Sequence, residues 1–496
     1  MRPCQPIFTV LLFGVLGIYT VSAQEPNQKP PVKPGPPEPN IGLAISQTTD
    51  LYRSGQIKEA QAKFELLNQK NPNNADIEAW LGFIYLRENQ AAKAIPFLQA
   101  ANKERPGDLE VMINFGNALM ATNQLDRALE KYKSVERLKA SMFEPYYNSG
   151  TIYLKRKEYR KALTEFSQAE RLKPKDPFVQ NNLGVAYQSL GQGSEALAHF
   201  KQAVEIRPDN RTFALNTGLT LLKLRQEQAA IPYFERITQQ GKGSPSEMLT
   251  LAEAYSKAGR AKDALAVYDS LANSQSKKAS YWFNVGVLRA KLAALSEAEK
   301  AYRNALGLNP NDLDVLNNLG LMLFAKGSFE EATTIFDKLS GLNPNSLSAK
   351  LNLGASAARC NQFPKAINVW KSALQMDPTN VRVRLDLANA LWQNSEPGAA
   401  QQEYANVLAK DKNNPEALNG MGLAYLAGKK FPEAEAVLRT CLQANPKYIS
   451  AYNNFAIVLE RTHRRTQAIA MLEQGLKLQP ADRDMRANLD RMKAAG

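Results

Sequence analysis

The chain has 496 residues, enough for roughly two to four ordinary domains, and its 44% apolar content excludes disorder along the whole length. Lys and Arg number 62 against 48 Asp and Glu, and the net charge of +14 is spread thinly along the chain. This excess favours anionic partners but does not require nucleic acid, and we expect none to be bound. Three Cys and two His argue against a disulfide scaffold or a Cys/His metal cluster, so we expect neither a metal nor a cofactor.

The first 23 residues have the pattern of an export signal. Arg2 is the only charge before residue 25, residues 7–21 are apolar, and residues 21–23 (VSA) supply the small-residue cleavage pattern. We therefore predict export to a bacterial-type periplasm or cell envelope. The alternative is an uncleaved anchor formed by residues 7–21 in the inner membrane, although fifteen residues are short for a span. Membrane contact is expected only through this N-terminus.

Residues 24–40 (QEPNQKPPVKPGPPEPN) contain seven prolines and almost no apolar side chains. Proline removes backbone donors and favours the extended polyproline II conformation, so this segment is predicted to be a solvated, disordered tether.

A 34-residue repeat fills residues 41–482 as thirteen ungapped units. Proline returns at multiples of 34, at Pro72, Pro106, Pro174, Pro208, Pro310, Pro344, Pro378, Pro446 and Pro480. An alanine column is filled in every unit, from Ala60 in steps of 34 to Ala468, and a glycine column in nine. Four residues after the alanine, ten units carry an aromatic residue. Such self-similarity is the signature of a repeat architecture.

Each unit is predicted to form two helices. Leu183, Gly184 and Tyr187 share one face at helical spacing, and Ala196 and Phe200 repeat that spacing after a turn. Gly184 and Ala196 let the two helices approach closely while the aromatic ring fills the space beside them. A single hairpin leaves its other face bare, so we expect its stability to come from stacking on its neighbours.

This pattern resembles the tetratricopeptide repeat family over about nine-tenths of the chain. The resemblance implies an all-α, right-handed alpha-alpha superhelix whose first helices line a concave groove. After the last unit, Met485, Leu489 and Met492 are spaced as the apolar face of a helix, so residues 483–496 are predicted to form a C-terminal capping helix. Residues 239–247 and 272–280 are irregular, and we expect a soft point there and not a domain boundary.

An active site is not apparent in the sequence. His199 falls in a second helix and His463 in a turn, without a neighbouring ligand pattern. Cys360 and Cys441 are more than two units apart, too far for a disulfide, and are predicted to be packing residues. We therefore expect no enzymatic activity.

An asparagine column stands two residues before the glycine column in eight units. About 200° of helix rotation separates the two columns, so these side chains point away from the close-packed glycine face. Asparagine is a poor helix former, yet its amide offers both a donor and an acceptor to a peptide backbone. The column resembles the asparagine ladder of O-linked N-acetylglucosamine transferases, which holds peptide main chain. The alternative is that each Asn bonds the neighbouring repeat. The residues are Asn114, Asn148, Asn182, Asn216, Asn284, Asn318, Asn352 and Asn454.

A basic column follows seven residues later, at nearly the same azimuth of the helix. Its members are Arg53, Arg87, Lys155, Lys223, Lys257, Lys291, Arg359 and Arg461. Each cation also sits near a helix C-terminus, where the helix dipole favours it, so a purely structural role is the alternative. Apolar residues between the columns, including Val185, Leu219 and Leu321, are candidate groove pockets.

Together these features predict an exported, non-catalytic scaffold that binds an extended protein or peptide segment in a concave groove. If both columns take part in binding, the ligand is an extended acidic segment or an anionic polymer. Three alternatives remain. The chain is a scaffold of an envelope polysaccharide synthesis or export machine, the targeting subunit of a transferase acting in trans, or a structural spacer. The repeat architecture alone does not separate them.

Overall fold

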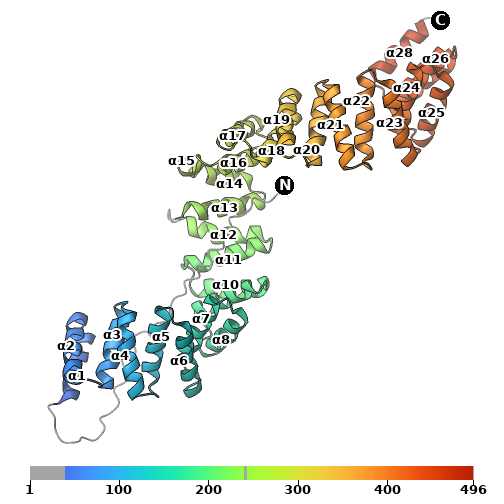
Figure 1. The fold of residues 1–496 in the computed structure, drawn as a ribbon. Coiled ribbons are helices and arrows are strands. Elements are labelled where there is room, and N and C mark those ends of the chain that lie inside the picture. Colours follow the sequence, from blue (N-terminus) through green and yellow to red (C-terminus); the bar gives the residue numbers. More distant parts are fainter. Residues whose placement is uncertain (1–39, 240–242, 495–496) are drawn as a thin grey trace. The chain divides into compact units, whose positions relative to one another are not determined.

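The computed structural model describes residues 40–239 and 243–494, which form 28 α-helices and no β-strand (Figure 1). The expected signal segment 1–23 and all but the last residue of the tether 24–40 lie outside the described residues. The chain divides into two compact units, residues 1–267 and residues 268–496. Among the described helices, none has the length and apolar character needed to cross a membrane.

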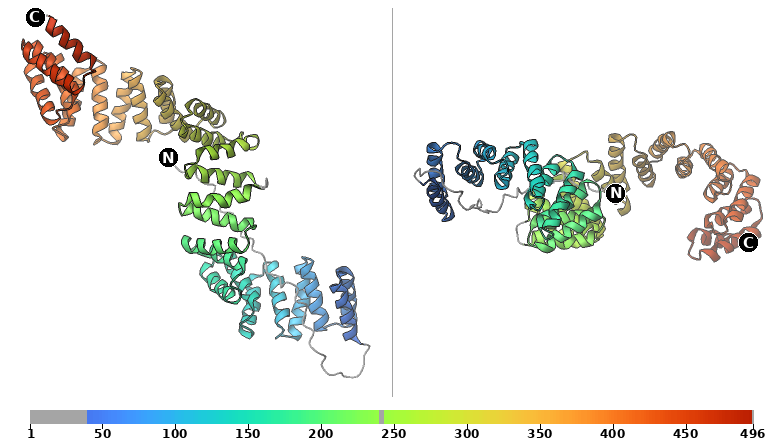
Figure 2. Two further views of the ribbon diagram at one scale, coloured as in Figure 1. Left: turned by 180° about the vertical axis from the view of Figure 1, so that it is seen from behind. Right: turned by 90° about the horizontal axis from the view of Figure 1, so that it is seen from below.

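Each unit is a stack of helix pairs, and successive helices pack on each other from α1 to α13 and from α16 to α28 (Figure 2). The first unit holds α1 (Ile41–Arg53), α2 (Ile57–Lys70), α3 (Ala75–Arg87), α4 (Ala91–Glu104), α5 (Leu109–Ala121), α6 (Leu125–Leu138), α7 (Phe143–Lys155), α8 (Tyr159–Leu172), α9 (Pro177–Ser189), α10 (Gly193–Ile206), α11 (Arg211–Lys223), α12 (Glu227–Thr238), α13 (Pro245–Lys257) and the start of α14 (Ala261–Ser270). The second unit holds α15 (Ala272–Gln275), α16 (Ala279–Lys291), α17 (Leu295–Leu308), α18 (Leu313–Lys326), α19 (Phe329–Leu342), α20 (Leu347–Arg359), α21 (Phe363–Met376), α22 (Val381–Gln393), α23 (Pro397–Lys410), α24 (Pro415–Ala427), α25 (Phe431–Ala444), α26 (Ile449–Arg461), α27 (Arg465–Leu478) and α28 (Arg483–Ala494). We call the odd-numbered helices from α1 to α13 and the even-numbered helices from α16 to α26 the first helices.

Short polar residues begin many first helices. At α9, the Asp176 carboxylate accepts hydrogen bonds from the backbone N–H groups of Phe178 and Val179, both at 3.0 Å. Pro177 follows as the first helical residue, where its missing N–H would have had no partner inside the helix. The same capping is seen at Asn74, Asp108, Asn210, Asp312, Ser346, Asn380 and Asn414.

The turn inside every helix pair contains one residue in the left-handed conformation, and these residues recur every 34 positions. Their φ angles lie between 56° and 86° at Gly55, Asn89, Asn123, Lys157, Gly191, Arg225, Gly259, Ala293, Gly327, Asn361, Ser395, Lys429 and His463. Glycine adopts this backbone conformation without steric cost, whereas residues with a side chain, such as Ala293 and His463, adopt it with strain.

The glycine and alanine columns bring the paired helices together. A Cβ atom at Gly184 would lie 2.6 Å from the Phe200 ring, and one at Gly320 would lie 2.6 Å from the Phe336 ring. Real Cβ atoms do not approach so closely, so each ring packs directly on the glycine backbone. All thirteen members of the alanine column are completely buried. The sequence therefore identified the contact between the paired helices correctly.

The last helix closes the second unit. Met485 and Met492 of α28 are each 1% exposed and pack with the residues of α26 and α27, while Leu489 is partly buried beside them. The all-α fold is thus confirmed, and a helix follows the last repeat and packs on it as predicted.

The irregular stretch lies near the division of the chain. α14 has 10 residues, and the four-residue helix α15 follows it. The two units divide between Val267 and Tyr268, inside α14, although the sequence led us to expect only a soft point in this region.

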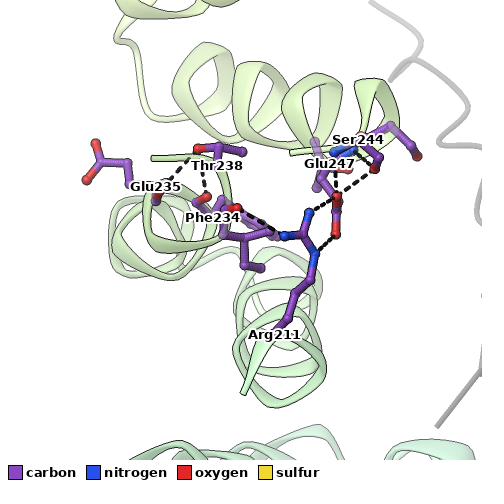
Figure 3. Close-up of polar contacts among 9 residues, drawn as sticks. Arg211, Phe234, Glu235, Thr238, Ser244 and Glu247 are labelled. Atoms are coloured by element: carbon purple, nitrogen blue, oxygen red, sulfur yellow. Dashed lines mark hydrogen bonds and ion pairs between the residues drawn. The ribbon is translucent and has the colours of Figure 1, made fainter. Parts of the chain in front are cut away.

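An ion pair joins the helices that precede this division (Figure 3). Arg211 of α11 donates through Nε to Glu247 Oε1 at 2.8 Å, and its Nη2 donates to the other carboxylate oxygen. Its Nη1 reaches the carbonyl of Ile237 at 3.3 Å. Glu247 also accepts from the backbone N–H of Ser244 at 2.8 Å, within a capping box. Glu247 stands at the position that buried Val179 occupies two repeats earlier, so this charged contact replaces apolar packing.

Candidate functional site

The asparagine column lies along the first helices, and its members differ in burial. Asn148 is 0% exposed, Asn182 2% and Asn454 9%. The other five members, Asn114, Asn216, Asn284, Asn318 and Asn352, are only partly buried. The column is therefore not one uniform surface.

Several of these amides bond the neighbouring first helix. Asn148 Nδ2 of α7 donates to Asn117 Oδ1 of α5 at 2.9 Å, and Asn182 Nδ2 of α9 donates to the Tyr147 hydroxyl of α7 at 3.1 Å. In the same manner, Asn216 donates to Asn181 at 2.8 Å and Asn454 donates to Asn419 at 2.8 Å. The α26–α28 pair continues the pattern, with Asn488 donating to Asn453 at 2.8 Å. These bonds tie stacked repeats to each other.

The acceptors of these bonds were missed at the level of sequence. Asn181, Asn419 and Asn453 each stand one residue before the column, and Asn117 stands three residues after it. The doubled asparagines at 181–182 and 453–454 were a visible signal of this arrangement. A binding role for the column itself stays a prediction.

Trp80, Asp386 and Gly420 stand at positions of the column where asparagine is absent, and each has a local structural reason. Trp80 stacks on Phe64 with ring centroids 5.7 Å apart and an interplanar angle of 11°. At Gly420, a Cβ atom would lie 2.3 Å from the Tyr404 ring, so no side chain fits. Asp386 pairs with Arg382 at 2.9 Å, and burial raises the pKa of its carboxyl.

The basic column is exposed at all eight positions. In the first unit, Lys155 Nζ donates to Asn123 Oδ1 at 2.7 Å, and Lys257 pairs with Glu253 at 2.6 Å. In the second unit, the Arg359 guanidinium lies over the Phe329 ring, 4.4 Å from its centroid. Lys223 of α11 and Lys291 of α16 end their helices with exposed side chains. Cations remain at the solvent boundary of the first helices in both units.

The apolar residues between the two columns also differ in exposure. Val185 is 8% exposed, whereas Leu321 is 45% exposed. Leu219, Val287 and Ile457 are partly buried. A pocket-forming role is therefore open to Leu321 but not to Val185 in this conformation.

The reactive side chains of the described residues have structural contacts. His199 Nδ1 lies 2.7 Å from Gln180 Oε1, its ring stacks on Tyr187, and burial lowers its pKa. Cys441 is buried and its Sγ lies 3.3 Å from the Pro415 carbonyl; burial raises the pKa of this thiol to about 11. Cys360 is a free, half-buried thiol. In residues 40–239 and 243–494, no three His, Cys, Asp or Glu side chains gather as metal ligands.

Known families match most of the repeat region. Profiles described as tetratricopeptide repeat match residues 47–108, 85–137, 177–210 and 425–489, and one described as TPR repeat matches residues 150–191. The C-terminal domain of cilia and flagella-associated protein 70 matches residues 211–418. No curated protein matches the sequence.

The solved structures that match the chain share little sequence with it. A structure titled as the APC/C hetero-tetramer Cut9-Hcn1 matches at 14% identity and a TM-score of 0.34, over 92% of this chain and 96% of the other. YrrB, described as a TPR protein with an unusual peptide-binding site, matches at 19% identity and a TM-score of 0.31, over 38% of this chain and 98% of the YrrB chain. Pseudomonas aeruginosa pilF matches at 19% identity and a TM-score of 0.36, over 40% of this chain and 90% of the pilF chain.

The helix pairs, their 34-residue recurrence and the family profiles agree with each other. The chain belongs to the tetratricopeptide repeat family, whose repeats serve as scaffolds for interactions with other proteins.

Proposed function

We propose that this chain is an exported, non-catalytic scaffold that binds an extended, acidic segment of another protein along its first helices. The observation that carries the proposal is the exposure of every cation in the basic column. A helix dipole accounts for one cation at a helix end, but a row of exposed cations also provides a field that attracts an acidic chain.

The half-buried asparagines supply the second element of this surface. An amide offers a donor and an acceptor, which match the N–H and C=O groups of an extended backbone. The asparagines that bond neighbouring helices have a different role, because they stabilise the stack that presents the surface.

Export to a periplasm or cell envelope is supported by the first 23 residues, and the proline-rich segment 24–40 then acts as a tether. Cleavage after Ala23 would release the mature chain. If residues 7–21 remain, they anchor the same scaffold at the inner membrane.

Partner capture tests this function. The mature chain and a variant with Lys155, Lys223 and Arg359 replaced by Gln would each be incubated with native envelope extract, and retained proteins identified by mass spectrometry. We expect acidic proteins to be held by the wild type, to be released by salt, and to be lost from the variant. Equal retention by both chains at every salt concentration would contradict the proposal. Mass spectrometry of the chain purified from cells would separately show whether it begins at Gln24.

A further inference from the structure

We propose that the binding part of the asparagine column lies in the second unit, on α18 and α20, and that the column on α7 and α9 only holds repeats together. This inference rests on the proposed function and specifies its location and the chemistry of its partner. The partner is an extended segment with an apolar side chain between two acidic ones.

The column is sealed on α7 and α9 of the first unit. Asn148 and Asn182 are 0% and 2% exposed, and the residues three positions after the column are closed as well: Asn117 is 2% exposed, Thr151 3% and Val185 8%. The two asparagine amides already donate to side chains of the preceding first helix. A ligand that used these amides would have to replace existing hydrogen bonds in a closed surface, which is unfavourable.

The column is more open on α18 and α20 of the second unit. Asn318 of α18 and Asn352 of α20 are only partly buried, and Leu321, one turn after Asn318, is 45% exposed. Asn318 Nδ2 donates to the Asp314 carbonyl at 2.7 Å, within its own helix, so this bond does not tie α18 to a neighbour. Two accessible amides beside an exposed leucine combine polar groups for orientation with apolar contact area, as ligand sites require.

Cations border this surface at the helix ends. Lys291 ends α16, Lys326 ends α18 and Arg359 ends α20, and all three are exposed. Lys326 is paired with Glu299 of α17, while Arg359 is placed over the Phe329 ring. Charge complementarity therefore favours a segment with acidic side chains, and the exposed leucine favours an apolar one between them.

The spacing of the helices sets the spacing of the motif. Packed helices lie roughly 8–10 Å apart, and an extended chain advances about 3.3 Å per residue, so about three residues pass each repeat. Acidic residues that meet Lys291 and Arg359, two repeats apart, are then about five or six residues from each other.

Labelled peptides test the location on the full mature chain. The probe is a fluorescent 12-residue peptide with a leucine midway between two aspartates six residues apart, in a serine and alanine background. Two control peptides replace the aspartates by lysine or the leucine by serine. Fluorescence anisotropy measures Kd for the wild type, for Asn318→Ala/Asn352→Ala, for Leu321→Asp, and for the matched variant Asn148→Ala/Asn182→Ala. Thermal melting of each chain reports folding.

We expect Asn318→Ala/Asn352→Ala and Leu321→Asp to raise Kd about tenfold without lowering the melting temperature. The matched variant should melt at a lower temperature but, while folded, bind the probe like the wild type. The lysine and serine peptides should bind more weakly than the probe.

Three results would overturn the inference. Loss of binding in the folded Asn148→Ala/Asn182→Ala variant, with binding kept by Asn318→Ala/Asn352→Ala, would move the site to the first unit and leave the proposed function intact. Equal binding of the lysine peptide would remove the acidic partner from both proposals. Failure of the wild type to bind the probe, together with acidic partners captured from extract, would overturn the motif and its location on α18 and α20 but not the scaffold function.

Discussion

Gly184 in α9 lies directly against the ring of Phe200 in α10, sixteen residues later in the chain. A Cβ atom at residue 184 would be 2.6 Å from two ring carbons, and Phe200 is completely buried. The same relationship joins Gly150 with Phe166 and Gly218 with Phe234. The contact explains why glycine and an aromatic residue recur together in these repeats.

Replacing Gly184 by Ala is therefore expected to destabilise the protein by about 1–3 kcal/mol, since the added methyl group overpacks a buried contact. Denaturant unfolding followed by circular dichroism measures the change. Gly307, near the end of α17, is the matched control because a Cβ atom there would meet nothing within 4 Å. Gly307→Ala should stabilise by about 0.5–1 kcal/mol through helix propensity alone. Equal effects at both positions would show that the aromatic contact is not the cause.

The left-handed turn position offers a stabilising substitution. Ala293 has a φ angle of 58° and is exposed, so its side chain brings backbone strain without burying apolar surface. Ala293→Gly should raise the free energy of unfolding by up to about 1 kcal/mol, because the αL conformation costs alanine about 1–2 kcal/mol and glycine gives back part of this as flexibility. The reverse change in the equivalent turn, Gly327→Ala, should destabilise. Opposite signs in thermal melts would support the strain, and a loss of stability in both variants would refute it.

Much of the fold followed from the sequence because small and aromatic residues recur at one fixed period. The alanine column could be recognised from identity and spacing alone, and all its members are buried. The left-handed turn residue was harder to recognise, because Ala293 and His463 fill it in place of glycine. Their conformation follows from the 34-residue repeat and not from their own preference.

The asparagine column shows where sequence reasoning stops. Asn148 and Asn318 occupy the same column and have the same side chain, yet the first is buried against Asn117 and the second bonds its own helix. The partner of each amide depends on the residue that the preceding first helix presents, and that residue varies from repeat to repeat. The periodicity therefore located the column but did not separate its bonded members from its accessible ones.

The Arg211–Glu247 pair should give stability that depends on pH. Burial alone raises the pKa of the Glu247 carboxyl, but the hydrogen bonds from Arg211 and Ser244 outweigh burial, so its pKa lies below the ordinary value of 4.5. A carboxyl with a lowered pKa stabilises the folded state above pH 4.5, and this contribution is lost as the pH falls below that value.

Glu247→Gln is expected to lower the free energy of unfolding at pH 7 by about 1 kcal/mol, a modest figure because Arg211 is partly exposed and solvent screens the pair. The loss of stability on acidification should become shallower in the variant. Melting temperatures of both chains across the acidic range measure the difference. Ser244→Ala, which removes the hydroxyl hydrogen bond to Glu247 but keeps the ion pair, should give a pH dependence between those of the wild type and Glu247→Gln. Parallel curves for the wild type and Glu247→Gln would exclude a contribution from this carboxylate.

The Glu78 carboxyl in α3 should give a contribution to stability with the opposite pH dependence. Other repeats carry a hydrogen-bond donor at the position of Glu78. There, Gln180, Arg384 and Tyr452 each donate to the backbone carbonyl six residues earlier, at 3.2, 3.0 and 2.9 Å. Glu78 is 5% exposed and its Oε2 is buried without a hydrogen-bond partner. Burial, followed by the nearby charge of Glu104, raises the pKa of the Glu78 carboxyl above 4.5.

A carboxyl with a raised pKa stabilises the fold while it is protonated, and the contribution is lost as the pH rises through the folded-state pKa. Glu78→Gln supplies a neutral donor at every pH. It is therefore expected to raise the free energy of unfolding by about 1 kcal/mol at pH 7 and to have little effect below pH 4.5, where the wild-type carboxyl is protonated in both states. Glu88→Gln, an exposed substitution that follows the same helix, is the matched control and should change neither value. If Glu78→Gln were neutral or destabilising at pH 7, the charged form would have a partner that compensates its burial, and the donor role of this column would not extend to α3.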